Sequence, residues 1–237
     1  MVTGQPLAEH NNIRAIRRSL SAITCLPLAR VRYLEHEADR LEEALEGVPF
    51  ALAPGLIQGD PQHRNALHTA DGTAVLCDWD TIAQGQPEWD LVTVEVHCRR
   101  FGYDEAHYQA FVDAYGLDIR ESAGYSVLRD IRELRMVTTN ARKVRHAPES
   151  LSEIQRRVDG LWGRDDQLQW NILLPSLPAA SKRLGGWFGA AGRSRAVVAV
   201  VLIVRARGPC SPASGWRGTA PAGGGAAPAA PHVRPDQ

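Results

Sequence analysis

Three side chains with oxygen ligands, those of Asp60, Asn65 and Asp78, lie near glycine, proline or the end of a predicted strand. Two carboxylates and a carboxamide are hard ligands that suit Mg²⁺, which takes few protein ligands and keeps water and phosphate oxygens for the rest of its coordination. The residue types and their place in loops therefore predict a magnesium site. Asp and Asn at turns also commonly cap backbone amides, so each of the three taken singly has a structural explanation as well.

A predicted β-hairpin gives a physical reason for two of these side chains to meet. Residues 66–69 and 73–77 have strand composition and flank Asp71-Gly72, a strong signal for a two-residue hairpin turn. In that register Asn65 faces Asp78, and side chains paired in this way stand about 5 Å apart. A longer loop would shift the register by one residue, and this pairing would then fail.

Helical periodicity dominates the chain on both sides of this hairpin. Apolar residues recur at three- and four-residue steps along residues 29–47, which predicts an amphipathic helix. Further helices are expected at residues 89–101, 105–115 and 121–144. Ser150 and Glu153 match a capping box for a last helix that reaches Trp162. The predicted fold class is α+β, mainly helical, with one small β-hairpin that carries the candidate catalytic and metal residues.

The formal net charge of zero hides an asymmetry between the body of the chain and its end. Eight of the 27 Lys and Arg residues, but only one of the 27 Asp and Glu residues, lie at Ser181 or beyond, which leaves 19 basic and 26 acidic residues before it. An acidic body argues against nucleic acid as a partner. It fits better with metal ions or cationic small molecules.

The cysteines and the apolar runs bear on the compartment. Four widely spaced cysteines without CxxC spacing are typical of reduced thiols, and with no signal-peptide pattern at the N-terminus they predict a cytoplasmic protein. The longest apolar run in the last third, residues 196–204, is far shorter than the roughly 20 residues that a spanning helix needs. No membrane association is therefore expected.

The loop and the residues after it resemble a known family. The segment from Asp60 to Asn65 has the spacing of a kinase catalytic loop, an Asp base followed five positions later by an Asn metal ligand. The apolar strand that ends in Asp78-Trp79-Asp80 is similar to the second metal-binding element of the aminoglycoside phosphotransferase and choline kinase-like family. The following segment, Gly85 to Leu91, looks like the G-x-P-x-x-D-L segment of that family. The resemblance covers roughly residues 25–165 and concerns the C-terminal lobe of this protein-kinase-like fold.

The resemblance implies a role for each matching residue. Asp60 would accept or orient the proton of a substrate hydroxyl group as it attacks the γ-phosphate of ATP or GTP. Asn65 and Asp78 would hold Mg²⁺ on the nucleotide phosphates. Asp90 would brace the catalytic loop from the start of the next helix. Acidic residues after it, namely Asp104, Glu105, Asp113 and Asp130, would meet a polycationic acceptor, unless they form an ordinary solvated face.

Two departures from the family pattern limit these implications. Gln58 stands where the family has a histidine before Gly-Asp, and its amide can replace part of the hydrogen bonding. The chain has lysine only at 143 and 182, and residues 1–59 contain neither a glycine-rich loop nor a strand lysine. We therefore expect three parts, with no N-lobe: an irregular or helical segment 1–24, a C-lobe 25–174, and a basic Gly/Pro/Ala-rich tail 175–237 that is disordered or the product of a frameshift.

Three functions follow as hypotheses. The first is a phosphotransferase, truncated at its N-terminus, that uses ATP or GTP with Mg²⁺ to phosphorylate the hydroxyl group of a small molecule. The second is a non-catalytic C-lobe remnant or interaction module that lacks nucleotide binding. The third is an unrelated Mg²⁺-dependent phosphohydrolase that uses the same carboxylates. The acceptor and the oligomeric state are not determined by the sequence, because related folds handle many hydroxyl substrates.

Overall fold

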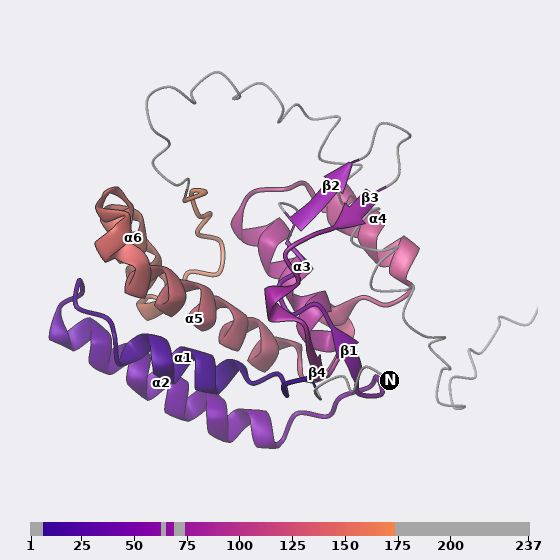
Figure 1. The fold of residues 1–237 in the computed structure, drawn as a ribbon, viewed down its shortest axis with the longest axis horizontal. Helices are drawn as coiled ribbons and strands as arrows, with labels where there is room; N and C mark the ends of the chain where they lie inside the picture. The colour runs from indigo at the N-terminus through magenta and orange to yellow at the C-terminus, as the bar shows by residue number, and fades with distance from the viewer. Residues whose placement is uncertain (1–6, 63–64, 69–73, 174–237) are drawn as a thin grey trace, which may run out of the picture.

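A computed structural model describes residues 7–62, 65–68 and 74–173 of the 237-residue chain. Figure 1 shows a mainly helical body with two small sheets. The helices are α1 (Asn12–Leu20), α2 (Leu28–Glu46), α3 (Glu88–Arg100), α4 (Glu105–Tyr115), α5 (Tyr125–Lys143) and α6 (Leu151–Trp162). The strands are β1 (Gly55–Ile57), β2 (Ala66–His68), β3 (Ala74–Leu76) and β4 (Ala83–Gly85). The predicted α+β class is confirmed in this part of the chain.

Helix α5 is the element around which the others pack. Helices α1 and α2 lie along it on one side, and α3 packs against it from the side that carries the strands (Figure 1). Its apolar positions Leu128, Ile131, Leu134 and Val137 recur every three residues and are buried. Because successive three-residue steps turn gradually around a helix of about 3.6 residues per turn, a broad face of α5 supplies the centre of the core.

The helices predicted from periodicity are confirmed, with small shifts at their ends. Gly47 is the C-cap residue of α2, and Gly116 is the C-cap residue of α4. Gly116 has φ +88°, a conformation that glycine adopts without strain. α5 begins four residues later than expected, after a short 3₁₀ turn at Ile119–Glu121. The capping box is wrong, because the Ser150 hydroxyl donates to the carbonyl oxygen of Ala147, while Glu153 binds Arg156, Arg157 and Asn171. No helix among the described residues has the length and apolar content to cross a membrane.

The two sheets are both antiparallel pairs that join the loop region to the helices. β1 pairs with β4, a strand that the sequence did not predict, and β2 pairs with β3. In the β2–β3 pair, Ala66 faces Leu76 and His68 faces Ala74. The register is therefore shifted by one residue from the predicted one, and the pairing of Asn65 with Asp78 is wrong. The predicted turn at Asp71-Gly72 lies outside the described residues, as does the tail 175–237.

Candidate active site

The loop at residues 58–60 is braced by the buried carboxylate of Asp90 at the start of α3. Its two oxygens accept hydrogen bonds from the backbone N–H groups of Gln58 and Gly59, each at 2.8 Å. Burial raises the pKa of Asp90 to about 6, although both backbone hydrogen bonds favour the charged form. The bracing role expected for Asp90 is confirmed, and it fixes the loop to the most buried helix of the fold.

The backbone conformation of Gly59 and the hydrogen bonds of Gln58 further restrict this loop. Gly59 has φ +85°, and a Cβ atom there would lie 2.5 Å from the carbonyl oxygen of Thr81, so only glycine fits. The side-chain amide of Gln58 donates to the Asp78 carbonyl oxygen at 2.7 Å and accepts from the Asp60 N–H at 2.6 Å. Gln58 therefore supplies the hydrogen bonds expected of it and ties the loop to the segment after β3.

Asp60 is half-buried and carries an ion pair with α5. One carboxylate oxygen lies 2.5 Å from a guanidinium nitrogen of Arg132, and the other accepts from the Gln62 amide at 2.8 Å. Burial alone would raise the pKa of Asp60, but the charges of Arg132 and His97 outweigh burial and lower it. The carboxylate is therefore ionised at neutral pH and able to accept a hydrogen bond from a hydroxyl group.

Asn65 and Asp78 reach the same region by different routes. Asn65 is buried, and its side-chain nitrogen donates to the backbone carbonyl oxygen of Asp60 at 2.9 Å, while the backbone carbonyl oxygen of Asn65 accepts from the Cys77 N–H at 2.8 Å. Asp78 is exposed, has φ 59° and directly follows Cys77. Such a left-handed conformation is uncommon outside glycine, and Asp tolerates it better than most residues. The backbone carbonyl of Asp78 accepts a hydrogen bond from the Gln58 amide. Asp78 lines one cleft with Asp60, whereas Asn65 is not among the residues that line it.

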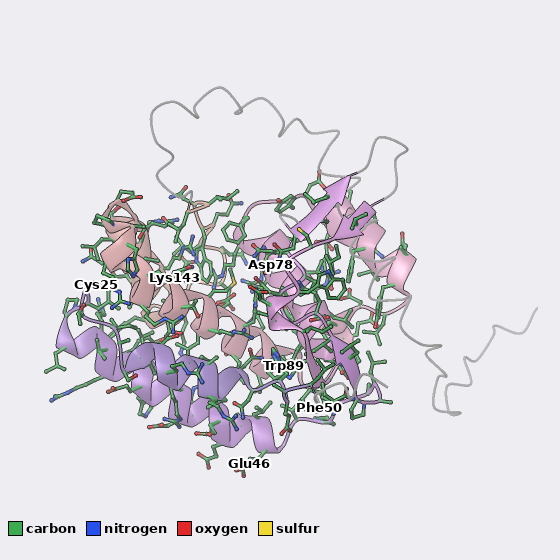
Figure 2. The ribbon with its side chains drawn as sticks, viewed as in Figure 1. Cys25, Glu46, Phe50, Asp78, Trp89 and Lys143 are labelled. Carbon is green, nitrogen blue, oxygen red and sulfur yellow. The ribbon has the colours of Figure 1, made fainter. Side chains whose placement is uncertain are left out.

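Asp60 and Asp78 line one cleft, which has a volume of about 480 Å³. The opposite wall is formed by α5, and in Figure 2 Asp78 and Lys143 both lie on the side of α5 away from α1 and α2. The residues that α5 contributes are Arg132, Arg135, Met136, Thr139, Asn140 and Lys143. Because these positions follow three- and four-residue steps, they form one continuous face of the helix.

The acidic residues expected to meet a polycationic acceptor do not line this cleft. Asp104 caps α4 by accepting from the His107 N–H at 2.7 Å, and Glu105 pairs with Arg120 at 2.7 Å. Asp113 accepts from Gln109 on the exposed side of α4, and Asp130 pairs with Arg129 at 2.8 Å. The structure corrects that expectation and supports the alternative, an ordinary acidic surface.

Arg132, Arg135 and His97 are residues of the cleft that motif analysis missed. Arg132 is 5% exposed and joins α5 to Asp60 across 72 residues of sequence. A local signal was present, because arginine recurs every third residue at 129, 132 and 135 inside an otherwise amphipathic helix. The partner of each arginine depends on tertiary packing, so the spacing alone could not assign one.

The arrangement of these elements is similar to part of the fold of two solved structures of LicA, a choline kinase. The structure of the choline kinase LicA in complex with AMP matches with a TM-score of 0.52, over 68% of this chain and 57% of that one. The structure of choline kinase LicA from Streptococcus pneumoniae matches with a TM-score of 0.50, over 66% and 56%. Both are 17% identical in sequence, so the likeness establishes the fold alone.

The resemblance to choline kinase-like proteins expected from the motifs is therefore confirmed at the level of the fold. This chain spans a little more than half the length of the choline kinases that it matches. No family model and no curated protein sequence matches it.

Proposed function

We propose that this chain is the metal- and acceptor-binding lobe of a phosphotransferase that transfers the γ-phosphate of ATP or GTP to a hydroxyl group of a small molecule. The observation that carries the proposal is the position of Asp60, an ionised carboxylate held in a cleft by a loop that Asp90 and Gln58 fix from two sides. This arrangement occurs within a fold shared with choline kinases, one of them bound to AMP.

Asp60 orients the acceptor in this proposal. Its carboxylate accepts a hydrogen bond from the substrate hydroxyl group, whose oxygen attacks the γ-phosphorus as the bond to the β-phosphate oxygen breaks. The nucleoside diphosphate leaves with that electron pair, and the hydroxyl proton passes to Asp60. Because the pKa of Asp60 is held low, its main contribution is to fix the direction of attack rather than to remove the proton early.

The donor set fits a magnesium ion supported by few protein ligands. Asn65 and Asp78 offer one carboxamide and one carboxylate, and Mg²⁺ in phosphotransferases uses one or two carboxylates together with phosphate oxygens. In this proposal phosphate oxygens and water complete the coordination of the ion. Among the described residues no group of three or more His, Cys, Asp and Glu could enclose a metal ion. When bound, the ion neutralises charge on the transferred group.

A lobe that keeps the catalytic loop without binding nucleotide is the second candidate. It is favoured by the absence of lysine from residues 1–59 and by the partial length of the match to choline kinases. The two candidates differ in one measurable property, the magnesium-dependent affinity for nucleotide.

Calorimetric titration of ATP and of GTP into the full chain, with and without Mg²⁺, separates them. We expect Mg²⁺-dependent binding that Asp78→Asn weakens about tenfold or more, since the variant removes the only carboxylate of the proposed metal site. Asp113→Asn, a matched change on the exposed side of α4, should leave binding unchanged. Binding that is absent, or equal in Asp78→Asn and the unchanged chain, would contradict the proposal and support the non-catalytic lobe.

A further inference from the structure

The charges on the two walls of the cleft are unequal. Four cationic side chains line it, those of Arg132, Arg135, Arg157 and Lys143, against two carboxylates, Asp60 and Asp78. Arg157 is neutralised by Glu153 at 2.9 Å, and Arg132 by Asp60 at 2.5 Å. Arg135 and Lys143 have no carboxylate within ion-pair distance in the part of the chain that the structure describes. The α5 wall therefore carries a surplus of positive charge.

Of the two cationic side chains without a carboxylate partner among the described residues, Arg135 is half-buried and Lys143 is exposed. The guanidinium group of Arg135 donates to the Asn12 side-chain oxygen and lies 3.4 Å from the His10 ring, and neither group carries a negative charge. Burial, and next the charge of Arg132, lower its pKa to about 10. A guanidinium group removed from water without a counter-ion is unfavourable, and an anion in the cleft would relieve that penalty.

Arg132, which lines the same cleft, has a buried polar atom without a partner in the described part of the chain. The side chain is 5% exposed, and its Nε atom is buried without a hydrogen-bond partner. Buried polar atoms in folded proteins are nearly always paired. The unpaired atom belongs to a residue that lines the cleft together with Asp60 and Arg135. Incompletely paired cationic groups therefore extend along α5 from the position of the Asp60 carboxylate.

The spacing of these groups limits the size of the anionic compound. Arg132 and Arg135 are three residues apart, which is a rise of about 4.5 Å along the helix. A molecule of a few heavy atoms therefore spans from a hydroxyl group at Asp60 to an anionic group at Arg135. Lys143 lies eight residues beyond Arg135, about 12 Å along the axis, and is exposed.

The cleft is poorly suited to a quaternary ammonium group, which is usually bound by free aromatic faces. Two aromatic side chains, Phe101 and Tyr103, line it. The guanidinium carbon of Arg157 already lies 5.7 Å from the centre of the Phe101 ring, and the Tyr103 ring stacks on His107 at 4.9 Å. Each of the two rings therefore already makes a contact within the protein that uses part of its surface.

We propose that the acceptor is a small hydroxylated compound that carries an oxyanion, a carboxylate or a phosphate group, which Arg135 binds while the hydroxyl group lies at Asp60. Lys143 attracts the same compound at longer range. This inference rests on the phosphotransferase function proposed above and names its substrate class.

Four probes of similar size test the inference by titration into the full chain at fixed ionic strength, since salt screens such attraction. Glycerate and glycerol 3-phosphate carry the two kinds of oxyanion, glycerol is the neutral compound and choline the cationic one. We expect one or both anions to bind about tenfold or more tightly than glycerol and choline. The ratio between the two anions distinguishes a carboxylate from a phosphate. Equal binding of all four, or tighter binding of choline, would overturn the inference.

Variants then assign the preference to a residue. Arg135→Gln should abolish the preference for the anion, and Arg135→Lys should retain part of it. Arg142→Gln, on the same helix but outside the cleft, should leave it unchanged. If Arg135→Gln weakens Mg²⁺-nucleotide binding and spares acceptor binding, Arg135 serves the nucleotide and the inference is wrong. The preference shown by the unchanged chain tests the inference even if Arg135→Gln does not fold.

The two proposals can fail separately. A chain that binds Mg²⁺-nucleotide and prefers choline would retain the phosphotransferase function and lose the anionic acceptor. A chain that binds the anion through Arg135 but no Mg²⁺-nucleotide would lose the phosphotransferase function and keep the anion site.

Discussion

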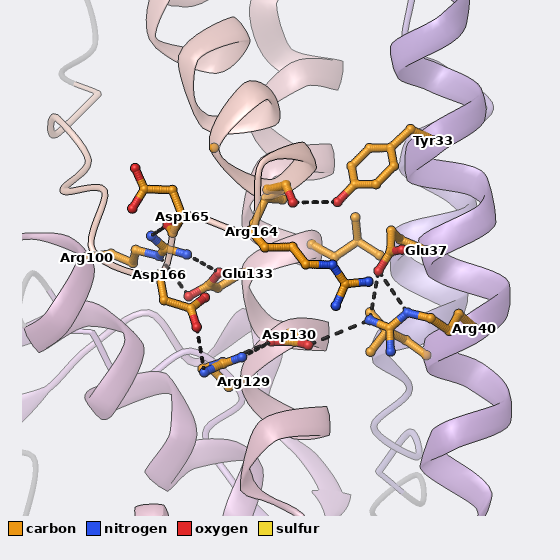
Figure 3. A pocket seen from close by; sticks show the side chains of 14 residues that line it. Tyr33, Glu37, Arg40, Arg100, Arg129, Asp130, Glu133, Arg164, Asp165 and Asp166 are labelled. Atoms are coloured by element: carbon orange, nitrogen blue, oxygen red, sulfur yellow. Dashed lines mark hydrogen bonds and ion pairs between the residues drawn. The ribbon is translucent and has the colours of Figure 1, made fainter.

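Two groups of arginines lie on α5 and the helices packed against it, and they differ in how completely carboxylates and other groups within the protein pair them. On one side of the helix, beside the cavity in Figure 3, Arg100 binds both oxygens of Glu133, at 2.8 and 2.6 Å. The remaining terminal nitrogen of Arg100 donates to the carbonyl oxygens of Asp165 and Leu168. Both Arg100 and Glu133 are almost fully buried. Every charge in this pair has a partner within the protein.

On the cleft side, Arg135 has only neutral partners, and one nitrogen of Arg132 has none. Burial of unmatched polar groups is unfavourable, so it is found mainly where a ligand or a catalytic role compensates for it. We therefore expect the fully paired arginines to stabilise the fold, and Arg135, which has no carboxylate partner among the described residues, to serve binding. Three measurements of stability test this distinction.

Loss of the buried pair should have the largest effect. Glu133→Gln leaves Arg100 charged and buried without a carboxylate, and breaking a buried ion pair from one side typically costs about 3–5 kcal/mol. Urea denaturation measures the change in the free energy of unfolding. Glu121→Gln, an exposed change just before α5, should cost less than about 0.5 kcal/mol. A loss for Glu133→Gln as small as that of the control would show that the pair is not structural.

Protonation of His10 beside Arg135 should have an intermediate effect that depends on pH. Burial, and then the charge of Arg135, lower the pKa of His10 from 6.5 to about 4. The unfolded chain therefore binds a proton at a higher pH than the folded chain, and stability should fall as pH decreases from 6.5 to 4, by up to about 3 kcal/mol.

Thermal melts of the unchanged chain and of His10→Gln across this interval give the difference that is due to His10. We expect the advantage of the unchanged chain to shrink towards pH 4. His36→Gln, on the exposed side of α2, should shift the curve equally at all these pH values. A difference for His10→Gln that is constant with pH would argue against an unneutralised positive charge at this place.

Removal of Arg135 should have the smallest effect on stability. Arg135→Gln removes a cation that no described carboxylate neutralises, so no buried charge loses its partner, and the free energy of unfolding should change by less than about 1 kcal/mol. The same urea measurement applies. A loss comparable with that of Glu133→Gln would place Arg135 among the structural arginines and remove the contrast between the two groups.

The sequence was sufficient for most of the helices and for the brace of the loop that carries Asp60. Periodic apolar positions predicted α2, α3, α4 and α5, because a helix that buries one face must repeat it every three or four residues, whereas α6 was predicted from a capping box that the structure does not contain. The pairs Gly59-Asp60 and Asp90-Leu91 matched family segments, and the hydrogen bonds of Asp90 bear out the role predicted from them.

The hairpin register was wrong for a physical reason. A turn signal such as Asp71-Gly72 predicts the shortest loop, but the β2–β3 pairing leaves five residues between His68 and Ala74. A shift of the register by one residue means that Asn65 lies opposite Cys77 instead of Asp78. Asp78 instead contacts the loop through its backbone carbonyl, which accepts from Gln58, and it has a left-handed backbone conformation that no local sequence rule required.

The sequence by itself determined the helices, the acidic loop residues and the likeness to a kinase lobe, because these depend on local periodicity and on short fixed spacings. Only the tertiary structure decided which charges meet. Arg132 reaches Asp60 across 72 residues, and Arg135 reaches Asn12 across 123. Whether an arginine is neutralised depends on groups far away in the sequence, and for that reason a chain with a formal net charge of zero contains a cleft with a cationic wall.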